Sequence, residues 1–167
     1  GLMLMALSNK TGALILSCGN KSEYATGYCT LYGDMCGAFA PIKDVLKTQV
    51  FALARWRNAH NPFDTADAPI PERIITRPPS AELRPDQVDQ DSLPPYEMLD
   101  ALLQQHLEQG AGTAELHAAG FQPEITQKIL RLIKISEYKR SQAAPGTRIS
   151  RRAFGRDWRL PLTQTFL

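Results

Sequence analysis

The sequence has few of the features that mark membrane-spanning, disulfide-bonded or zinc-binding proteins. Its three cysteines, Cys18, Cys29 and Cys36, are an odd number and include no CxxC pair, so neither a disulfide framework nor a zinc site is indicated. No apolar run approaches the roughly 20 residues that a membrane-spanning helix needs. The formal net charge of +2 is too small to indicate a polyelectrolyte partner by itself. These features predict a cytoplasmic globular protein with reduced thiols and no membrane partner.

The small net charge hides an asymmetry along the chain. Residues 1–127 carry 9 Lys and Arg against 15 Asp and Glu, a net charge of −6, whereas residues 128–167 carry 10 against 2, a net charge of +8. The pattern is typical of a C-terminal region that faces an anionic ligand, nucleic acid or an acidic partner surface. A solvated basic face explains it equally well.

The N-terminal part has the order of elements that precedes a ligand site in open parallel sheets. Residues 2–7 read as the end of a helix that starts before Gly1, unless Gly1 is left over from cloning. Residues 13–17 predict a short buried strand, and a turn at Gly19 and Asn20 leads into a helix that begins at Lys21. Ligands of parallel α/β sheets bind just beyond the carboxyl ends of such strands.

The middle of the chain predicts one helix and one long loop. The apolar pattern of residues 42–58 predicts an amphipathic helix with Asp44 as N-cap and with Leu53 and Trp56 on the apolar face. Residues 60–95 hold eight of the twelve prolines, and such a loop is usually an active-site lid or is disordered. Residues 73–76 predict a short strand inside it.

The C-terminal half predicts a series of helices. One begins at Pro95 and ends at Gly110, a second is capped by Thr113 and runs to Gly120, and a third follows Gln122. The apolar stripe of the first consists of Tyr96, Leu99, Leu102, Leu103 and Leu107.

The residues by themselves indicate a phosphate-binding site after the first predicted strand. A helix N-terminus there offers backbone N–H groups, although neither a GxxxxGK[ST] loop nor a GxGxxG follows a strand. Glu23 is a candidate Mg²⁺ ligand or an acceptor for a ligand hydroxyl or amide, or it merely complements the helix dipole. Lys43 and Lys47 could reach a phosphate or could face solvent, and Ser80 could hold a ligand with its hydroxyl.

Several motifs resemble those of one enzyme family. The segment from Leu16 to Val50 contains SCGNKSE, GYCTLYGD and IKDVLKT, where the family has TTGNKSE, GY.TLYGD and IKDV.KT. Further matches are PSAEL.P.Q.D.DSLPPY.MLD, from Pro79 to Asp100, and ISEYKR followed by RI..R.FGRDWR.P, between Ile135 and Pro161. This order is similar to the synthetase domain of glutamine-dependent NAD synthetases.

The resemblance implies a fold, a reaction and an assembly. The fold would be an adenine-nucleotide α-hydrolase-like, doubly wound parallel sheet, here incomplete and with a helical C-terminal half. ATP with Mg²⁺ would adenylate deamido-NAD, and ammonia, free or from glutamine, would displace AMP to give NAD. A homodimer or higher homo-oligomer, without nucleic acid, is implied.

The resemblance also assigns roles to seven residues, while no catalytic residue is identified. Cys18, Lys47 and Ser80 would contact ATP, with Cys18 in the place of the family's Thr. Glu23 would contact Mg²⁺ and deamido-NAD. The remaining deamido-NAD contacts would be Asp34, Tyr138 and Lys139.

The sequence lacks the SGGxDS loop that grips the ATP pyrophosphate in this family, and also the glutaminase domain. Residues 1–167 are therefore expected to be the C-terminal portion of a synthetase domain, inactive alone, with residues 60–95 as the lid. Three alternatives stay open: a non-catalytic chain that associates with a synthetase subunit, another enzyme of the ATP-pyrophosphatase type, and a nucleic-acid-binding module.

Overall fold

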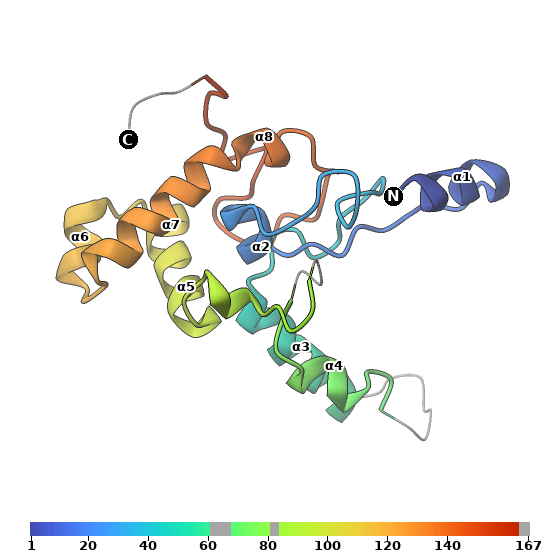
Figure 1. Cartoon of the computed structure of the whole chain (residues 1–167), viewed down its shortest axis with the longest axis horizontal. Coiled ribbons are helices and arrows are strands. Elements are labelled where there is room, and N and C mark those ends of the chain that lie inside the picture. Colours follow the sequence, from blue (N-terminus) through green and yellow to red (C-terminus); the bar gives the residue numbers. More distant parts are fainter. Residues whose placement is uncertain (61–67, 81–83, 164–167) are drawn as a thin grey trace.

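The computed structural model describes residues 1–60, 68–80 and 84–163, and within these ranges the regular secondary structure is helical, joined by turns and loops. The helices are α1 (Leu2–Thr11), α2 (Lys21–Thr26), α3 (Lys47–Ala59), α4 (Glu72–Thr76), the 3₁₀ helix η1 (Asp89–Asp91), α5 (Tyr96–Leu103), the π-helical η2 (Gln104–Gln109), α6 (Thr113–Ala118), α7 (Pro123–Ile135) and α8 (Glu137–Arg140). In Figure 1, α2 lies near the centre, α6 and α7 lie on one side, and α1 projects from the other.

The prediction of a buried strand at residues 13–17 is wrong, because the segment is largely exposed and forms a single β-bridge. The segment is extended but pairs only locally, through a parallel bridge between Leu16 and Phe39 with Ser17 N donating to Phe39 O at 2.9 Å. Leu14 and Leu16 remain 65% and 58% exposed because no second strand or helix among the described residues covers them. Within these ranges there are only isolated bridges, so the doubly wound sheet is not confirmed.

The middle of the chain departs from the sequence pattern in two further ways. Helix α3 begins at Lys47 rather than at residue 42, and it buries no residue: Leu53 is 52% and Trp56 is 57% exposed. The start moves because Asp44 is not an N-cap and has other partners, described below. Residues 73–76 belong to helix α4, not to a strand, since each turn is closed by local bonds such as Arg77 N to Arg73 O at 3.0 Å. Part of the proline-rich segment, residues 61–67 and 81–83, lies outside the described residues.

The predicted helical C-terminal half is confirmed. All five members of the stripe on α5 and η2 are at most 4% exposed, and they pack with Tyr24 of α2 and with Ile129 and Ile133 of α7. Thr113 is the first residue of α6 rather than its cap, because Gly112 takes the N-cap position. The core therefore joins α2 to α5, η2, α6 and α7.

Helix α1 stands apart from this core. It buries none of its residues, and Leu2 and Met3 are 87% and 86% exposed. It ends at Gly12, whose backbone adopts the left-handed conformation with φ 71°. Across the described ranges, no helix has the length and apolar character to cross a membrane.

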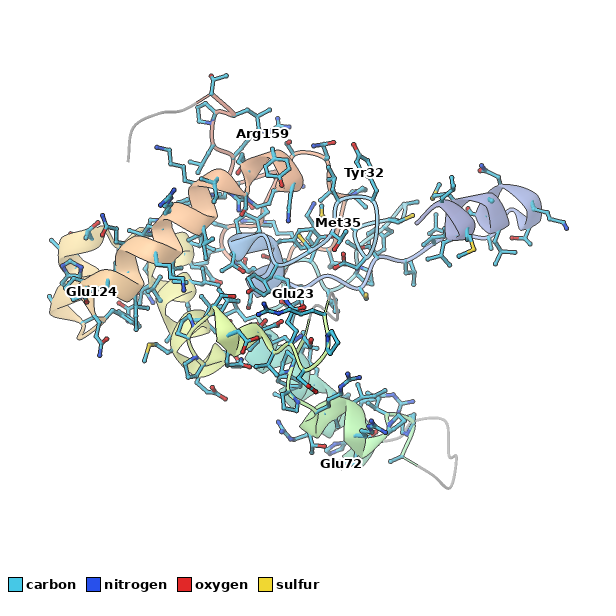
Figure 2. All side chains as sticks on the ribbon, in the orientation of Figure 1. Glu23, Tyr32, Met35, Glu72, Glu124 and Arg159 are labelled. Carbon is cyan, nitrogen blue, oxygen red and sulfur yellow. The ribbon has the colours of Figure 1, made fainter. Side chains whose placement is uncertain are left out.

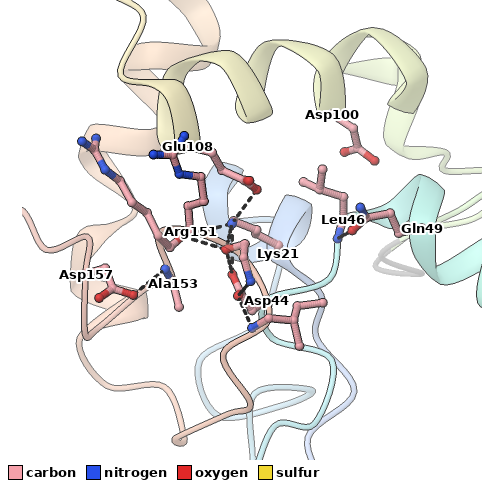
Figure 3. A network of polar contacts seen from close by, with 12 residues as sticks. Lys21, Asp44, Leu46, Gln49, Asp100, Glu108, Arg151, Ala153 and Asp157 are labelled. Atoms are coloured by element: carbon pink, nitrogen blue, oxygen red, sulfur yellow. Dashed lines mark hydrogen bonds and ion pairs between the residues drawn. The ribbon is translucent and has the colours of Figure 1, made fainter.

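A buried ionic network fixes the basic C-terminal segment to α2 (Figure 3). Lys21, 1% exposed, contacts Asp44 Oδ1 at 3.0 Å and Glu108 Oε1 at 3.1 Å, and donates to Ser150 Oγ at 2.6 Å. Asp44 also accepts from the backbone N–H groups of Ile149 at 2.8 Å and Ser150 at 2.6 Å. Asp44 therefore organises the C-terminal segment instead of capping α3.

We expect this network to make stability depend on pH at the acid end. Burial alone would raise the pKa of Asp44, but hydrogen bonds from Ser150 and Ile149, with the Lys21 ammonium, outweigh burial and lower it. Because the folded pKa lies below the unfolded value of about 3.9, the contribution of Asp44 is present above that value and is lost as the pH falls through the folded pKa. Between about pH 6 and about pH 3, the melting temperature should decrease less steeply with falling pH for Asp44→Asn than for the unchanged chain. Parallel slopes would contradict the assignment.

Candidate functional site

One cavity of about 570 Å³ gathers most of the residues that the sequence singled out. Its wall consists of Glu23, Gly27, Tyr28, Cys29, Thr30, Gly33, Asp34, Lys47, Ser80, Gln87, Asp89 and Lys139. Five of the seven predicted site residues, Glu23, Asp34, Lys47, Ser80 and Lys139, are in this wall although they are far apart in the sequence. Figure 2 shows Glu23 near the middle of the molecule, whereas Glu72 and Glu124 lie towards its ends.

Glu23 is positioned by the first turn of α2. Asn20 is the N-cap: its side chain accepts from Glu23 N at 3.1 Å, and Glu23 Oε2 accepts from Asn20 N at 3.1 Å. This reciprocal capping box needs a carboxylate or amide three residues after the cap. The other oxygen, Oε1, forms an ion pair with Lys47 Nζ at 2.8 Å. Glu23 thus serves both the helix terminus and the cavity.

Lys47 is positioned by an acid on another helix. Helix α3 has no side-chain cap of its own, and Asp100 of α5 takes that role: its Oδ2 accepts from Thr48 N and from Thr48 Oγ1, both at 2.8 Å. Its Oδ1 accepts from Ser22 Oγ at 2.5 Å, and Ser22 Oγ accepts from Lys47 N at 2.9 Å. Because these bonds occupy the first N–H groups of α3, the Lys47 ammonium, rather than this helix terminus, is the available anion-binding group.

The opposite part of the wall is formed by residues 27–34 and α8. Lys139 Nζ donates to Gly27 O at 2.6 Å and to Cys29 O at 2.7 Å, so α8 holds this loop in place. Asp34 Oδ1 accepts from Thr30 N at 2.5 Å and closes the loop. Burial raises the pKa of the Cys29 thiol to about 12, so Cys29 lines the cavity as a neutral group and not as a nucleophile.

Ser80 joins the cavity to a smaller one. The second cavity, about 250 Å³, is lined by Lys47, Phe51, Ile74, Arg77, Pro78, Pro79 and Ser80. Lys47 and Ser80 belong to both walls, so an ammonium and a hydroxyl stand where the two spaces adjoin. Arg77 adds a second cationic side chain to the wall of the smaller cavity.

Three candidates lie elsewhere. Cys18 is exposed, and Tyr138 is 49% exposed on α8; neither lines the cavity. Lys43 is 6% exposed and donates to Ala144 O at 2.7 Å, and burial lowers its pKa. Lys43 therefore has a structural role. Of the described part of the basic region 128–167, Lys139 is the residue in this wall, and the expectation that the rest of the region faces an anionic ligand stays a prediction.

Asp89 and Tyr28 also line the cavity, although no role was predicted for them. Both are in or beside segments without helical periodicity. Their place in two of the family motifs, Tyr28 in GYCTLYGD and Asp89 in PSAEL.P.Q.D.DSLPPY.MLD, is the signal that could have identified them.

The residues fit Mg²⁺ only in part. Among the described residues, no three His, Cys, Asp or Glu side chains are grouped as metal ligands. Mg²⁺ is commonly held by one or two carboxylates together with substrate phosphates. Glu23, and Asp34 across the cavity, satisfy that minimum if Glu23 leaves Lys47.

Comparison with known proteins agrees with the motifs. Residues 1–143 match the NAD synthase family. The chain is 57% identical to the glutamine-dependent NAD(+) synthetase of Acinetobacter baylyi, over 97% of this chain and 29% of the relative. It is 54% identical to the synthetase of Xanthomonas campestris, over 99% of this chain and 29% of the relative.

A solved structure supports the fold. The crystal structure of a glutamine-dependent NAD(+) synthetase from Cytophaga hutchinsonii superposes with a TM-score of 0.75 at 21% identity, covering 98% of this chain and 26% of that one. The chain thus spans about 29% of the length of the curated relatives that it matches. The family match over most of the chain, together with the order of its motifs, shows that the chain belongs to the NAD synthase family.

Proposed function

We propose that this chain is part of an ATP-dependent ligase that amidates deamido-NAD to NAD through an adenylate. The observation that carries the proposal is the cavity in which Glu23, Asp34, Lys47, Ser80 and Lys139 converge. These are the side chains to which the family resemblance gives roles in binding ATP and deamido-NAD. The fold brings them together from four separate segments.

ATP would occupy the side of the cavity where Lys47 and Ser80 adjoin the smaller space. Lys47 is paired with Glu23 at 2.8 Å, so phosphate binding requires an exchange of partners. The phosphate would pair with the Lys47 ammonium, and the Glu23 carboxylate could then bind a cation. Mg²⁺, when bound, would neutralise charge on the phosphates. Fixed groups of this kind accelerate a reaction because they need no reorganisation as charge develops.

Deamido-NAD would occupy the side formed by residues 27–34 and α8. Asp34 and Lys139 are the charged groups there, and each is fixed to backbone by short hydrogen bonds. Residues 60–95 would cover the adenylate and exclude water, which would otherwise hydrolyse it. Cys18 and Tyr138 remain proposed contacts; because both are exposed, a ligand that extends out of the cavity would have to reach them.

Turnover should need more than these 167 residues. The SGGxDS loop implied by the resemblance is absent from the sequence, and no other described segment offers a glycine-rich phosphate loop. Glutamine or free ammonium as the nitrogen source, a homo-oligomeric assembly and a cytoplasmic location stay predictions. A non-catalytic chain that associates with a synthetase subunit is the alternative.

The decisive experiment is NAD formation from deamido-NAD, ATP-Mg²⁺ and ammonium. It should be run on this chain and on a form extended upstream to include the SGGxDS loop, hereafter the extended protein. We expect turnover only by the extended protein, since this chain has just part of the phosphate site. A folded extended protein that makes no NAD would overturn the proposal. Turnover by the short chain would show that the missing loop is dispensable.

A further inference from the structure

Asp89 is a buried carboxylate in the wall of the cavity, and the proposed chemistry leaves it without a role. It is 4% exposed and lies at the start of η1. Its backbone N donates to Pro79 O at 2.9 Å, which fixes it beside Ser80. Its Oδ2 accepts from the hydroxyl of Tyr96 at 2.5 Å. Both its backbone and one of its oxygens are therefore held by the fold.

The other oxygen, Oδ1, is buried and has no hydrogen-bond partner among the residues that the structure describes. Buried carboxylate oxygens are almost always satisfied, because an ionised group without a donor is costly in a medium of low polarity. The nearby lysines do not serve it: Lys47 is paired with Glu23, and Lys139 donates to two carbonyl groups. An orphan acceptor in the wall of a binding cavity indicates a ligand donor.

We propose that Asp89 Oδ1 accepts an N–H hydrogen bond from the nitrogen substrate and orients it in the site. The substrate enters as ammonia or ammonium, and it attacks as ammonia after any ammonium has released a proton to solvent. This inference rests on the proposed amide-forming function and adds the residue that receives the nitrogen substrate. Ammonia bound by its N–H groups keeps its lone pair free for the activated carboxyl carbon. Tyr96 selects which carboxylate oxygen remains free for this task.

Charge and size favour this ligand over the other substrates. A carboxylate repels the phosphate groups of ATP and deamido-NAD, whereas it attracts ammonium and accepts hydrogen bonds from the N–H groups of ammonia. The field of Asp89 acts within the cavity: burial, and then the charges of Asp89 and Asp91, raise the pKa of Tyr28. Oδ1 has less than 1 Å² of accessible area, so the wall must open before any donor can reach it, and ammonia needs the smallest opening. A nucleoside hydroxyl would require a larger opening.

The test is Asp89→Asn in the extended protein, with KM measured separately for ammonium, ATP and deamido-NAD. The Tyr96 hydroxyl donates to Asp89, and the new amide keeps this bond when its carbonyl oxygen faces Tyr96. The NH₂ group then occupies the position of Oδ1 and opposes an N–H donor. We expect the KM for ammonium to rise about 10- to 100-fold, the range for a hydrogen bond to a charged group. The KM values for ATP and deamido-NAD should change less than about threefold.

A second variant separates this role from a structural one. In Asp89→Asn/Tyr96→Phe the amide is free to turn its carbonyl oxygen to the cavity, so part of the loss in ammonium KM should be recovered. Asp91→Asn, an exposed carboxylate of the same turn, is the matched control. If Asp89→Asn does not fold, Asp89→Ser carries the same comparison.

The outcomes are distinct. An ammonium KM that stays within about twofold in Asp89→Asn, or a larger rise in the KM for ATP, deamido-NAD or Mg²⁺, would overturn the inference. The inference would also be overturned if the KM for ammonium were higher in Asp89→Asn/Tyr96→Phe than in Asp89→Asn. If the unchanged extended protein forms no NAD, the proposed function itself fails.

Discussion

Replacing Lys47 by Met in the extended protein should lower kcat/KM for ATP by about 100- to 1,000-fold, the scale of losing a charged group from a preorganised phosphate site. The ammonium stands where the two cavities adjoin, and because Asp100 caps α3, the Lys47 ammonium is the group of this helix that would meet a phosphate after leaving Glu23. Initial rates of NAD formation against ATP concentration measure the effect.

Two comparisons make this prediction specific. Glu23→Gln should lose activity on a similar scale, because the amide keeps the contact to Asn20 N but cannot pair with Lys47 or a cation. Lys128→Met, an exposed lysine on α7, is the control and should retain full activity. A Lys47→Met protein with an unchanged KM for ATP and unchanged kcat would remove Lys47 from the site.

Replacing Arg140 by Met should destabilise the chain by about 3–5 kcal/mol, the usual cost of breaking a buried ion pair. Arg140 is 2% exposed and holds Glu137 Oε2 with Nη2 at 2.9 Å and Nε at 3.1 Å. It also donates to the carbonyl groups of Tyr24 at 3.1 Å and Ala25 at 2.9 Å, at the end of α2. Urea unfolding followed by circular dichroism gives the change in the free energy of unfolding.

The double variant Arg140→Met/Glu137→Leu tests the origin of that loss. Removing both charges eliminates the unpaired carboxylate, so part of the stability should return. The return should be incomplete, since the α2 carbonyl groups still lack a donor. Arg140→Lys should also lose stability, because an ammonium cannot reproduce the planar set of five donors. If Arg140→Met were as stable as the unchanged chain, the structural role of Arg140 would be refuted.

The helical parts of the fold could be predicted where the apolar period was long and clear. The stripe on α5 and η2 is an example: five large residues at helical spacing lie on one face, and such a face is buried in the core. The predictions failed where burial depends on distant neighbours. Leu14 and Leu16 read as core because of their composition, yet only the segment at Phe39 pairs beside them. Asp44 has the residue type of an N-cap, but Ile149 and Ser150 compete for its carboxylate.

The sequence by itself determined the family, through motifs whose order and spacing are specific, and it named five of the residues in the wall of the cavity. The capping box of Asn20 and Glu23 was not predicted, although it is local to four residues and the residue types allow it. Only the tertiary structure showed that Lys47 pairs with Glu23, that Asp100 caps α3 from another helix, and that one oxygen of Asp89 has no partner. These facts join residues from separate helices and turns, and no local pattern encodes such distances. Local bonding can be read along the chain, whereas the partners of a buried charge are decided by which segments the core brings together.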